Sequence, residues 1–122
     1  MRHLALFLIL ISFSSCYHVE RNCNYYKTGS FYSEIVIDSI TYTSRFKRTD
    51  KLQVEIFENK IDSSNVRWIN DCEMVFKTIN PKSRIDKKDI HLKILTTTDT
   101  SYTFEYSYVG ESKKQRGIAY KD

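Results

Sequence analysis

Residues that interrupt regular structure are scarce in this chain of 122 residues, which has three glycines and one proline. Disordered linkers and collagen-like chains need far more of both, so the composition excludes these classes. The three glycines also stand apart from one another, at Gly29, Gly110 and Gly117. Because a phosphate-binding loop needs several glycines close together, the sequence excludes such a loop as well.

Metal-ligand patterns and catalytic bases are equally sparse. Beyond His3 there are only His18 and His91, and no Cys-x-x-Cys or His-x-x-x-His pair occurs. A zinc site needs three or four suitably spaced ligands, so we expect no metal and no cofactor. Ser-His-Asp chemistry would depend on His91 as the base, and nothing local marks a serine as its nucleophile. Hydrolysis is therefore a distant hypothesis, and we expect a protein that is not an enzyme.

A strong charge of one sign is missing too. The formal net charge is +4, and charged residues make up 28% of the chain. A dedicated nucleic-acid-binding domain usually carries a larger and more clustered positive charge. We therefore expect no nucleic-acid partner.

A short apolar run at residues 4–11 lies near the N-terminus. Arg2 and His3 precede it, and small residues followed by Cys16 come after it. This order is typical of a secretory signal peptide over residues 1–15, and the run is shorter than the roughly 20 residues that span a bilayer. The run Phe13-Ser14-Ser15-Cys16 resembles a bacterial lipobox, apart from Phe13 where leucine is usual. The alternative is an ordinary signal peptide with an incidental cysteine.

If Cys16 is lipidated, the chain is anchored in the cell envelope through its N-terminal acyl chains. Residue 17 is Tyr and not Asp, so the retention signal that holds some lipoproteins in the inner membrane is missing. We therefore expect a lipid-anchored protein of the outer membrane that faces the periplasm. Residues 16–27 then form a lipidated tether, and residues 28–122 a single β domain.

Two further cysteines fit the same compartment. Lipidation of Cys16 leaves Cys23 and Cys72 as one pair, and exported chains form disulfides in an oxidising environment. The sequence predicts a Cys23–Cys72 bridge from the start of the mature chain to a mid-chain strand. The alternative is two buried, unpaired thiols.

Short β-rich runs divided by turn residues fill the rest of the chain. Their spacing of about 8–12 residues is typical of an all-β fold. In the third run, Leu52, Val54 and Ile56 share one face and Gln53 and Glu55 the other. After Asn80-Pro81, residues 82–89 have a composition that predicts one short helix of about two turns. The predicted strands are 30–37, 42–48, 52–57, 64–69, 72–79, 90–97, 102–109 and 116–121.

Eight strands with mostly short connections predict an antiparallel meander. Closing such a sheet into a lipocalin-like barrel removes its exposed edges, although a strongly curved open sheet is the alternative. An eight-stranded barrel is either filled by side chains or just large enough for one small ligand.

An aromatic stripe is the best candidate for a ligand pocket. Tyr102, Phe104, Tyr106 and Tyr108 alternate along one strand and so share a face, and Trp68 is a candidate to join them. Such a surface suits an apolar or glycan ligand that hydroxyl groups orient. The alternative is that these rings form the hydrophobic core.

Several runs together resemble a known group of proteins: residues 16–23, 27–31, 67–73 and 113–120. They look like small, uncharacterised flavobacterial-type lipoproteins, over nearly the whole mature chain. The resemblance implies an exported, β-rich domain and no known activity or site residue. Members are sometimes labelled DNA topoisomerase IV, but about 107 residues outside the cytoplasm cannot supply an ATP-binding or strand-cleaving domain.

The leading hypothesis is therefore a non-enzymatic, membrane-tethered binding domain of the cell envelope. Its partner is either a small apolar or glycan ligand held in the barrel, or another envelope protein. The second hypothesis is a structural or assembly accessory whose barrel is filled. A cavity beside the stripe at Tyr102–Tyr108 distinguishes the first from the second.

Overall fold

The computed structural model describes residues 20–122. The predicted signal peptide at residues 1–15 and the predicted lipidation site, Cys16, lie outside this range, as does His18. Within residues 20–122, no helix is long and apolar enough to cross a membrane.

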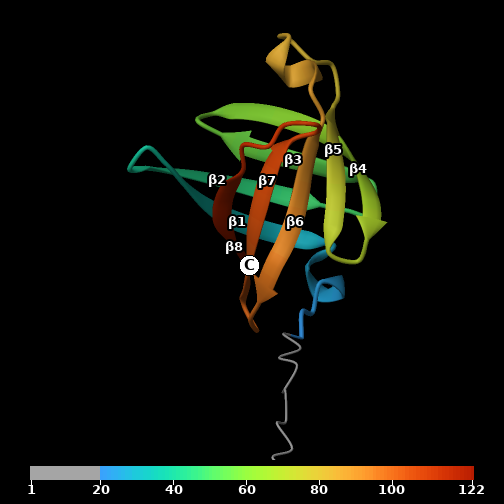
Figure 1. The fold of residues 1–122 in the computed structure, drawn as a ribbon, viewed down its shortest axis with the longest axis vertical. Coiled ribbons are helices and arrows are strands. Elements are labelled where there is room, and N and C mark those ends of the chain that lie inside the picture. The colour runs from blue at the N-terminus through green and yellow to red at the C-terminus, as the bar shows by residue number, and fades with distance from the viewer. Residues whose placement is uncertain (1–19) are drawn as a thin grey trace, which may run out of the picture.

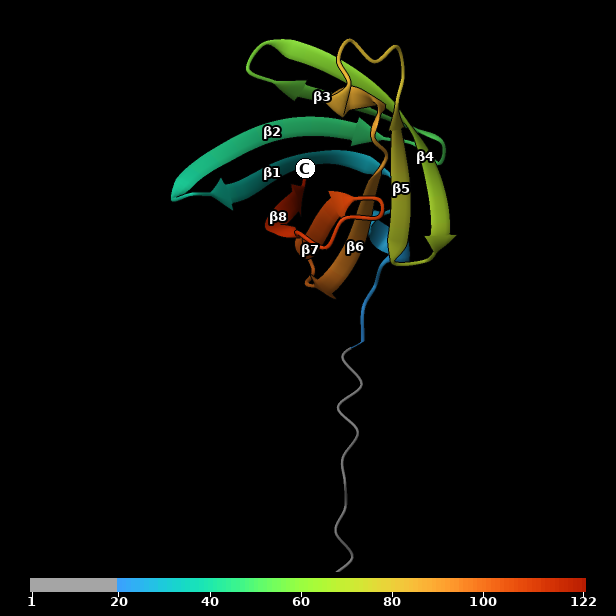
Figure 2. The same cartoon turned by 45° about the horizontal axis from the view of Figure 1, so that its top comes forward.

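Eight antiparallel strands form a closed barrel in which every strand pairs with its neighbours in the sequence, and β8 closes on β1 (Figures 1 and 2). The predicted all-β meander is therefore confirmed, and closure decides between the barrel and the open sheet. The strands are β1 (Gly29–Ile37), β2 (Ile40–Arg48), β3 (Leu52–Phe57), β4 (Lys60–Asn70), β5 (Glu73–Thr78), β6 (Ile90–Thr97), β7 (Ser101–Tyr108) and β8 (Gln115–Lys121).

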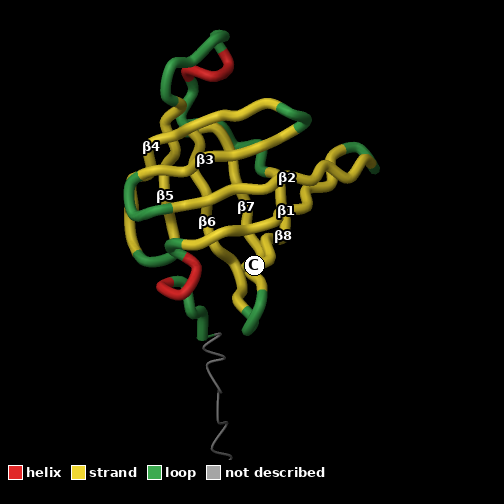
Figure 3. The backbone as a smooth tube through the Cα atoms, turned by 180° about the vertical axis from the view of Figure 1, so that it is seen from behind, coloured by secondary structure: helices red, strands yellow, loops and turns green. Residues whose placement is uncertain are grey.

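Two of the hairpins with two-residue turns carry both turn residues in the left-handed region. Asp38 and Ser39 join β1 to β2, and Glu58 and Asn59 join β3 to β4, all four with positive φ. This geometry matches the right-handed twist of the flanking strands. The β1–β2 hairpin is long enough to extend past the rest of the barrel, as Figure 3 shows from behind.

The predicted helix at residues 82–89 is wrong. Only a single 3-10 turn, η2 (Ile85–Lys87), forms there, and it buries no residue. A two-turn helix makes too few hydrogen bonds to be stable alone, and this one has no core to pack against. Asn80 has a φ of 54° and so does not adopt the extended conformation of an N-cap.

The folded domain begins before residue 28, where the sequence placed its boundary. A second 3-10 turn, η1 (Asn24–Tyr26), packs under one end of the barrel. Cys23 is 2% exposed and Tyr26 is fully buried in the core. Residues 23–26 of the predicted tether therefore belong to the folded domain.

The predicted disulfide is present between Cys23 and Cys72. It joins the segment that leads into η1 to the turn between β4 and β5. The end of the barrel that carries η1 and this disulfide is called the closed end below, and the opposite end, beside η2, is called the mouth (Figure 1).

Aromatic side chains fill the closed end. Phe31 of β1 stacks on Phe46 of β2 with ring centroids 4.9 Å apart, and Tyr26 lies 5.1 Å from Tyr102 of β7. All four are buried. Aromatic pairs at such distances contribute beyond the area that they bury, so this end is well packed.

One buried arginine lies at the centre of these rings. Arg48 is 1% exposed, and its guanidinium donates hydrogen bonds to the backbone oxygens of Tyr26 (2.5 Å) and Lys27 (2.9 Å). It also donates to Oε1 of Gln53 (3.0 Å) and to the hydroxyl of Tyr102 (3.3 Å). A buried charge is tolerated only when its hydrogen-bonding groups are satisfied, and here carbonyls and aromatic rings do so.

Gly117 of β8 lets the barrel close. A Cβ at this position would lie 2.7 Å from Cζ of Phe104 and 2.8 Å from the backbone oxygen of Glu34. Backbone atoms of a paired strand cannot move aside, so only glycine fits where β8 meets β1.

The predicted alternation in β3 is confirmed, but its polar face points inward. Glu55 is the cross-strand partner of the core residue Phe46, and Gln53 is the partner of the buried Arg48. Since paired residues share a face, Gln53 and Glu55 point into the barrel, and Leu52, Val54 and Ile56 point out. This inversion places a carboxylate in the interior.

Candidate ligand site

The predicted aromatic stripe spans both ends of the barrel and does not form one pocket. Tyr102 and Phe104 are buried in the core towards the closed end. Trp68 is partly buried against the same core, with the charged groups of Lys27 and Arg48 at 5.1 and 5.8 Å from its ring. For these three residues the core alternative is the correct one.

Tyr106 and Tyr108 lie at the mouth instead, where the barrel interior is not filled. Three adjoining recesses of about 300, 270 and 250 Å³ open there, and Tyr106 lines all three. Tyr108 lines the smallest. Together they form what is called the mouth cavity below.

One side of the mouth cavity is apolar. Ile35 of β1, Phe76 of β5 and Ile90 of β6 line its central recess beside Tyr106. All four point inward from strands on several sides of the barrel. Ligand cavities in proteins are commonly lined in this way by apolar and aromatic side chains.

The other side is acidic. Glu55 of β3 and Asp62 of β4 are cross-strand partners and both line the central recess, with Asp86 from the loop that carries η2. Within residues 20–122, neither Glu55 nor Asp62 forms an ion pair with a lysine or arginine. Burial, and then the negative charge of Asp62, raise the pKa of the Glu55 carboxyl above its ordinary value.

Tyr106 faces both sides of the cavity. Burial raises the pKa of its hydroxyl above its ordinary value, and the neighbouring Tyr108 and Glu55 add to the shift. The hydroxyl therefore stays protonated at neutral pH and is available as a hydrogen-bond donor. The central recess of the mouth cavity thus combines apolar side chains, the carboxylates of Glu55, Asp62 and Asp86, and the phenol of Tyr106. Glu111 and Lys113 line the smallest recess beside it.

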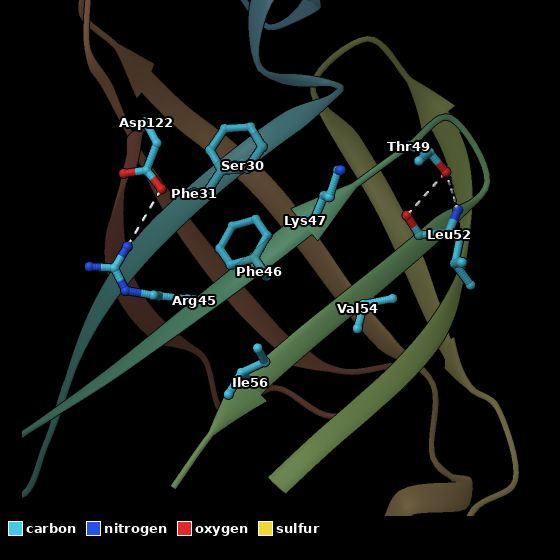
Figure 4. Close-up of a pocket in the computed structure, with 10 residues that line it drawn as sticks. All are labelled: Ser30, Phe31, Arg45, Phe46, Lys47, Thr49, Leu52, Val54, Ile56 and Asp122. Atoms are coloured by element: carbon cyan, nitrogen blue, oxygen red, sulfur yellow. Dashed lines mark hydrogen bonds and ion pairs between the residues drawn. The ribbon is translucent and has the colours of Figure 1, made fainter. Parts of the chain in front are cut away.

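A separate groove of about 520 Å³ runs along the outer wall of the barrel (Figure 4). Leu52, Val54 and Ile56 line it, and an ion pair of 3.6 Å between Arg45 and Asp122 lies at one side. The core residues Phe31 and Phe46 also line it. Another recess, of about 730 Å³ and mostly polar, lies at the closed end beside Glu20–Asn22.

The residues for hydrolysis come together only in part. His91 Nε2 lies 3.3 Å from Oε1 of Glu73, and Ser107 is the cross-strand partner of His91. A serine nucleophile is activated by a hydrogen bond to its general base. Within the described chain, no hydrogen bond joins Ser107 to His91. The backbone N–H groups of central strands are also committed to the sheet, so they are not free to stabilise an oxyanion.

No group of three or more His, Cys, Asp or Glu side chains in residues 20–122 is arranged to hold a metal ion. Comparisons with family models, with curated proteins and with solved structures find no match for this chain.

Glu55 and Asp62 are the site residues that sequence reasoning missed. No local motif marks them, because the inward orientation of Glu55 depends on the pairing of β2 with β3. The alternation of Gln53 and Glu55 with apolar residues was visible in the sequence, but alternation alone does not say which face is inside.

Proposed function

We propose that this chain is a non-enzymatic lipoprotein of the cell envelope that binds one small ligand in the mouth of its barrel. The observation that carries the proposal is the mouth cavity, with recesses of about 300, 270 and 250 Å³ at one end of a barrel whose other end is filled. An eight-stranded barrel has room for one small ligand, so this volume matches the architecture.

The position of the N-terminal segment supports an anchored arrangement. The described chain begins at Glu20, only four positions after Cys16, and at the closed end (Figure 1). An acylated Cys16 would therefore hold the closed end towards a membrane and leave the mouth directed away from it. The Cys23–Cys72 disulfide suits an oxidising compartment such as the periplasm, and we propose the outer membrane as the site of anchoring because Tyr17 replaces the retention signal.

A structural accessory with a filled barrel is the second candidate. The packed closed end favours it, because aromatic rings and Arg48 fill the barrel interior there. The mouth favours binding. A barrel filled for stability would have large apolar side chains at this end, but Glu55 and Asp62 stand there instead.

Native mass spectrometry of the full chain tests the binding proposal. The protein is expressed with its own N-terminus in a bacterial host, extracted from membranes in mild detergent and sprayed intact. We expect a reproducible added mass that disappears on denaturation, besides the covalent acyl mass. A clean mass of the acylated chain alone, across several hosts and detergents, supports the filled-barrel accessory and contradicts ligand binding.

Replacement of Cys16 tests the anchor. We expect Cys16→Ser to abolish incorporation of labelled fatty acid, whereas Cys72→Ser in the same host keeps the label. Unchanged labelling of the Cys16 variant would refute lipidation at this residue.

A further inference from the structure

The acidic wall of the mouth cavity stands out against the rest of the chain. The formal net charge is +4, so positive charge is in excess overall. Three carboxylates nevertheless line the central recess of about 270 Å³, from Glu55, Asp62 and Asp86, and no lysine or arginine lines it. The recess is therefore negative within a basic protein.

This arrangement costs stability in the absence of a ligand. Glu55 and Asp62 are direct cross-strand partners on the inner face of the barrel, where like charges repel. Glu55 is also only partly exposed to water. An energetically unfavourable pair of this kind inside a cavity is typical of a binding site and not of a core.

The opposite wall limits what can neutralise these charges. Apolar surface also lines the same recess, from Ile35, Phe76, Ile90 and Tyr106. A fully hydrated small ion would leave this surface in contact with water. A divalent metal would need at least three ligands around one point, and the described residues hold no such group. An organic cation can pair its charge with the carboxylates and place its apolar portion against the apolar side chains.

We infer that the ligand of the mouth cavity carries a protonated or quaternary nitrogen attached to an apolar portion. The nitrogen lies between the carboxylates of Glu55 and Asp62, and the apolar portion lies against Ile35, Phe76 and Ile90. Tyr106 contributes its ring to the apolar wall and its hydroxyl to a polar group of the ligand. This inference rests on the proposed binding function and specifies the chemical class of the ligand.

Three probes of equal chain length test the inference: octylamine, octanol and octanoate. Each is titrated calorimetrically into the full chain in the same detergent at pH 7, where octylamine is positive and octanoate negative. We expect octylamine to bind at least about tenfold more tightly than octanol, because charge pairs in a partly buried site are weakly screened. Octanoate should bind most weakly, because its carboxylate is repelled.

Two isosteric variants of glutamate identify the site. Glu55→Gln should weaken octylamine binding by about tenfold and leave octanol binding unchanged, because only the charge is removed. Glu34→Gln is the matched control: Glu34 lies on β1 next to the inward-facing Ile35 and therefore faces outward. The control should change octylamine affinity by less than about twofold.

The outcomes separate the inference from the proposed function. Equal binding of the three probes, tighter binding of octanoate, or an octylamine affinity that Glu55→Gln does not change would overturn the cationic ligand and leave ligand binding itself intact. If none of the probes binds and the native mass is clean, both proposals are wrong.

Discussion

The two ends of the barrel are built from the same eight strands but solve opposite problems. At the closed end, Arg48 is the only buried charged residue of residues 20–122, and carbonyls, an amide and a phenol accept or share its hydrogen bonds. At the mouth, Glu55 and Asp62 face each other without a basic ion-pair partner in the described chain. The hydrogen bonds of Arg48 therefore stabilise the closed end, whereas repulsion between Glu55 and Asp62 destabilises the mouth.

The difference also extends to covalent structure. The disulfide and η1 lie at the closed end, together with the aromatic cluster of Tyr26, Phe31, Phe46 and Tyr102. The mouth has the loop at residues 79–89, which contains only one 3-10 turn and is tied to the turn after β7 by an ion pair of 2.8 Å between Lys88 and Glu111. A rigid end and a less strongly packed end in one domain are the expected division between scaffold and binding surface.

The largest effect is expected from the disulfide. Cys72→Ala removes a bridge with a sequence separation of 49 residues, and closing a loop of that size stabilises by about 4 kcal/mol in the chain-entropy account. Urea denaturation should show this loss under oxidising conditions. In reductant, the variant and the wild type should have almost the same free energy of unfolding. An equal loss in both conditions would mean that Cys72 acts through packing.

Removal of the buried arginine comes next. Arg48→Met keeps much of the side-chain volume but leaves the oxygens of Tyr26, Lys27 and Tyr102 without their donor. We expect a loss of about 3 kcal/mol in the free energy of unfolding. Arg67→Met, at an exposed position of β4, should cost less than about 0.5 kcal/mol. Equal stability of the two variants would contradict a stabilising role for Arg48.

A methyl group at the closure point should have an intermediate effect. Gly117→Ala places a Cβ against Phe104 and against the backbone of β1, and overpacking of this kind costs about 2 kcal/mol. Ser112→Ala, in the exposed turn before β8, is the control and should stay within about 0.5 kcal/mol of wild type. A neutral Gly117 variant would show that β8 can move away from β1 without loss.

The smallest expected effect has the opposite sign. Because the pKa of Glu55 is raised in the folded chain, the folded state holds its proton to higher pH than the unfolded state does. Stability therefore falls as pH rises above the unfolded pKa through the folded pKa, and the penalty is fully present above both. Glu55→Gln should raise Tm by about 2–4 °C at pH 7 and change it little at pH 4.

Other titrating groups around Glu55 set the control for that measurement. Tyr42 of β2, Asp62 of β4, Asp86 of the loop and Tyr106 of β7 line the recesses that Glu55 lines. The negative charge of Asp62 is one of the causes that raise the pKa of Glu55, so Asp62→Asn should produce the same sign of change. A lower Tm for Glu55→Gln at pH 7 would mean that its carboxylate is stabilised and not penalised.

Strand positions and the disulfide could be predicted from the sequence because both depend on local or compositional signals. β3 and β6 begin and end where the turn residues predicted, and Cys23 pairs with Cys72 as the cysteine count implied. Register could not be predicted. It decides that Glu55 points inward, because Glu55 faces the core residue Phe46 on the next strand. Tyr102 and Tyr106 share a face, and Tyr102 is the one in the core because Tyr26 of η1 packs against it.

The helix prediction fails for a related reason. Residues 82–89 have suitable composition, but helix stability in a short segment comes from tertiary packing. In the described chain this loop lies beyond the mouth of the barrel, and η2 buries none of its residues there. The sequence of residues 82–89 shows their helix propensity, but it does not show that the folded barrel offers them no surface to pack against.

Hydrogen–deuterium exchange of the full chain, with and without octylamine, tests the division between the two ends most directly. We expect octylamine to slow exchange in peptides around Tyr106 and in the loop at residues 79–89. Peptides around Arg48 and the C-terminal Asp122 should exchange at the same rate in both conditions. Protection around Arg48 and Asp122 in place of Tyr106 would put the ligand in the outer groove and contradict the mouth as the binding site.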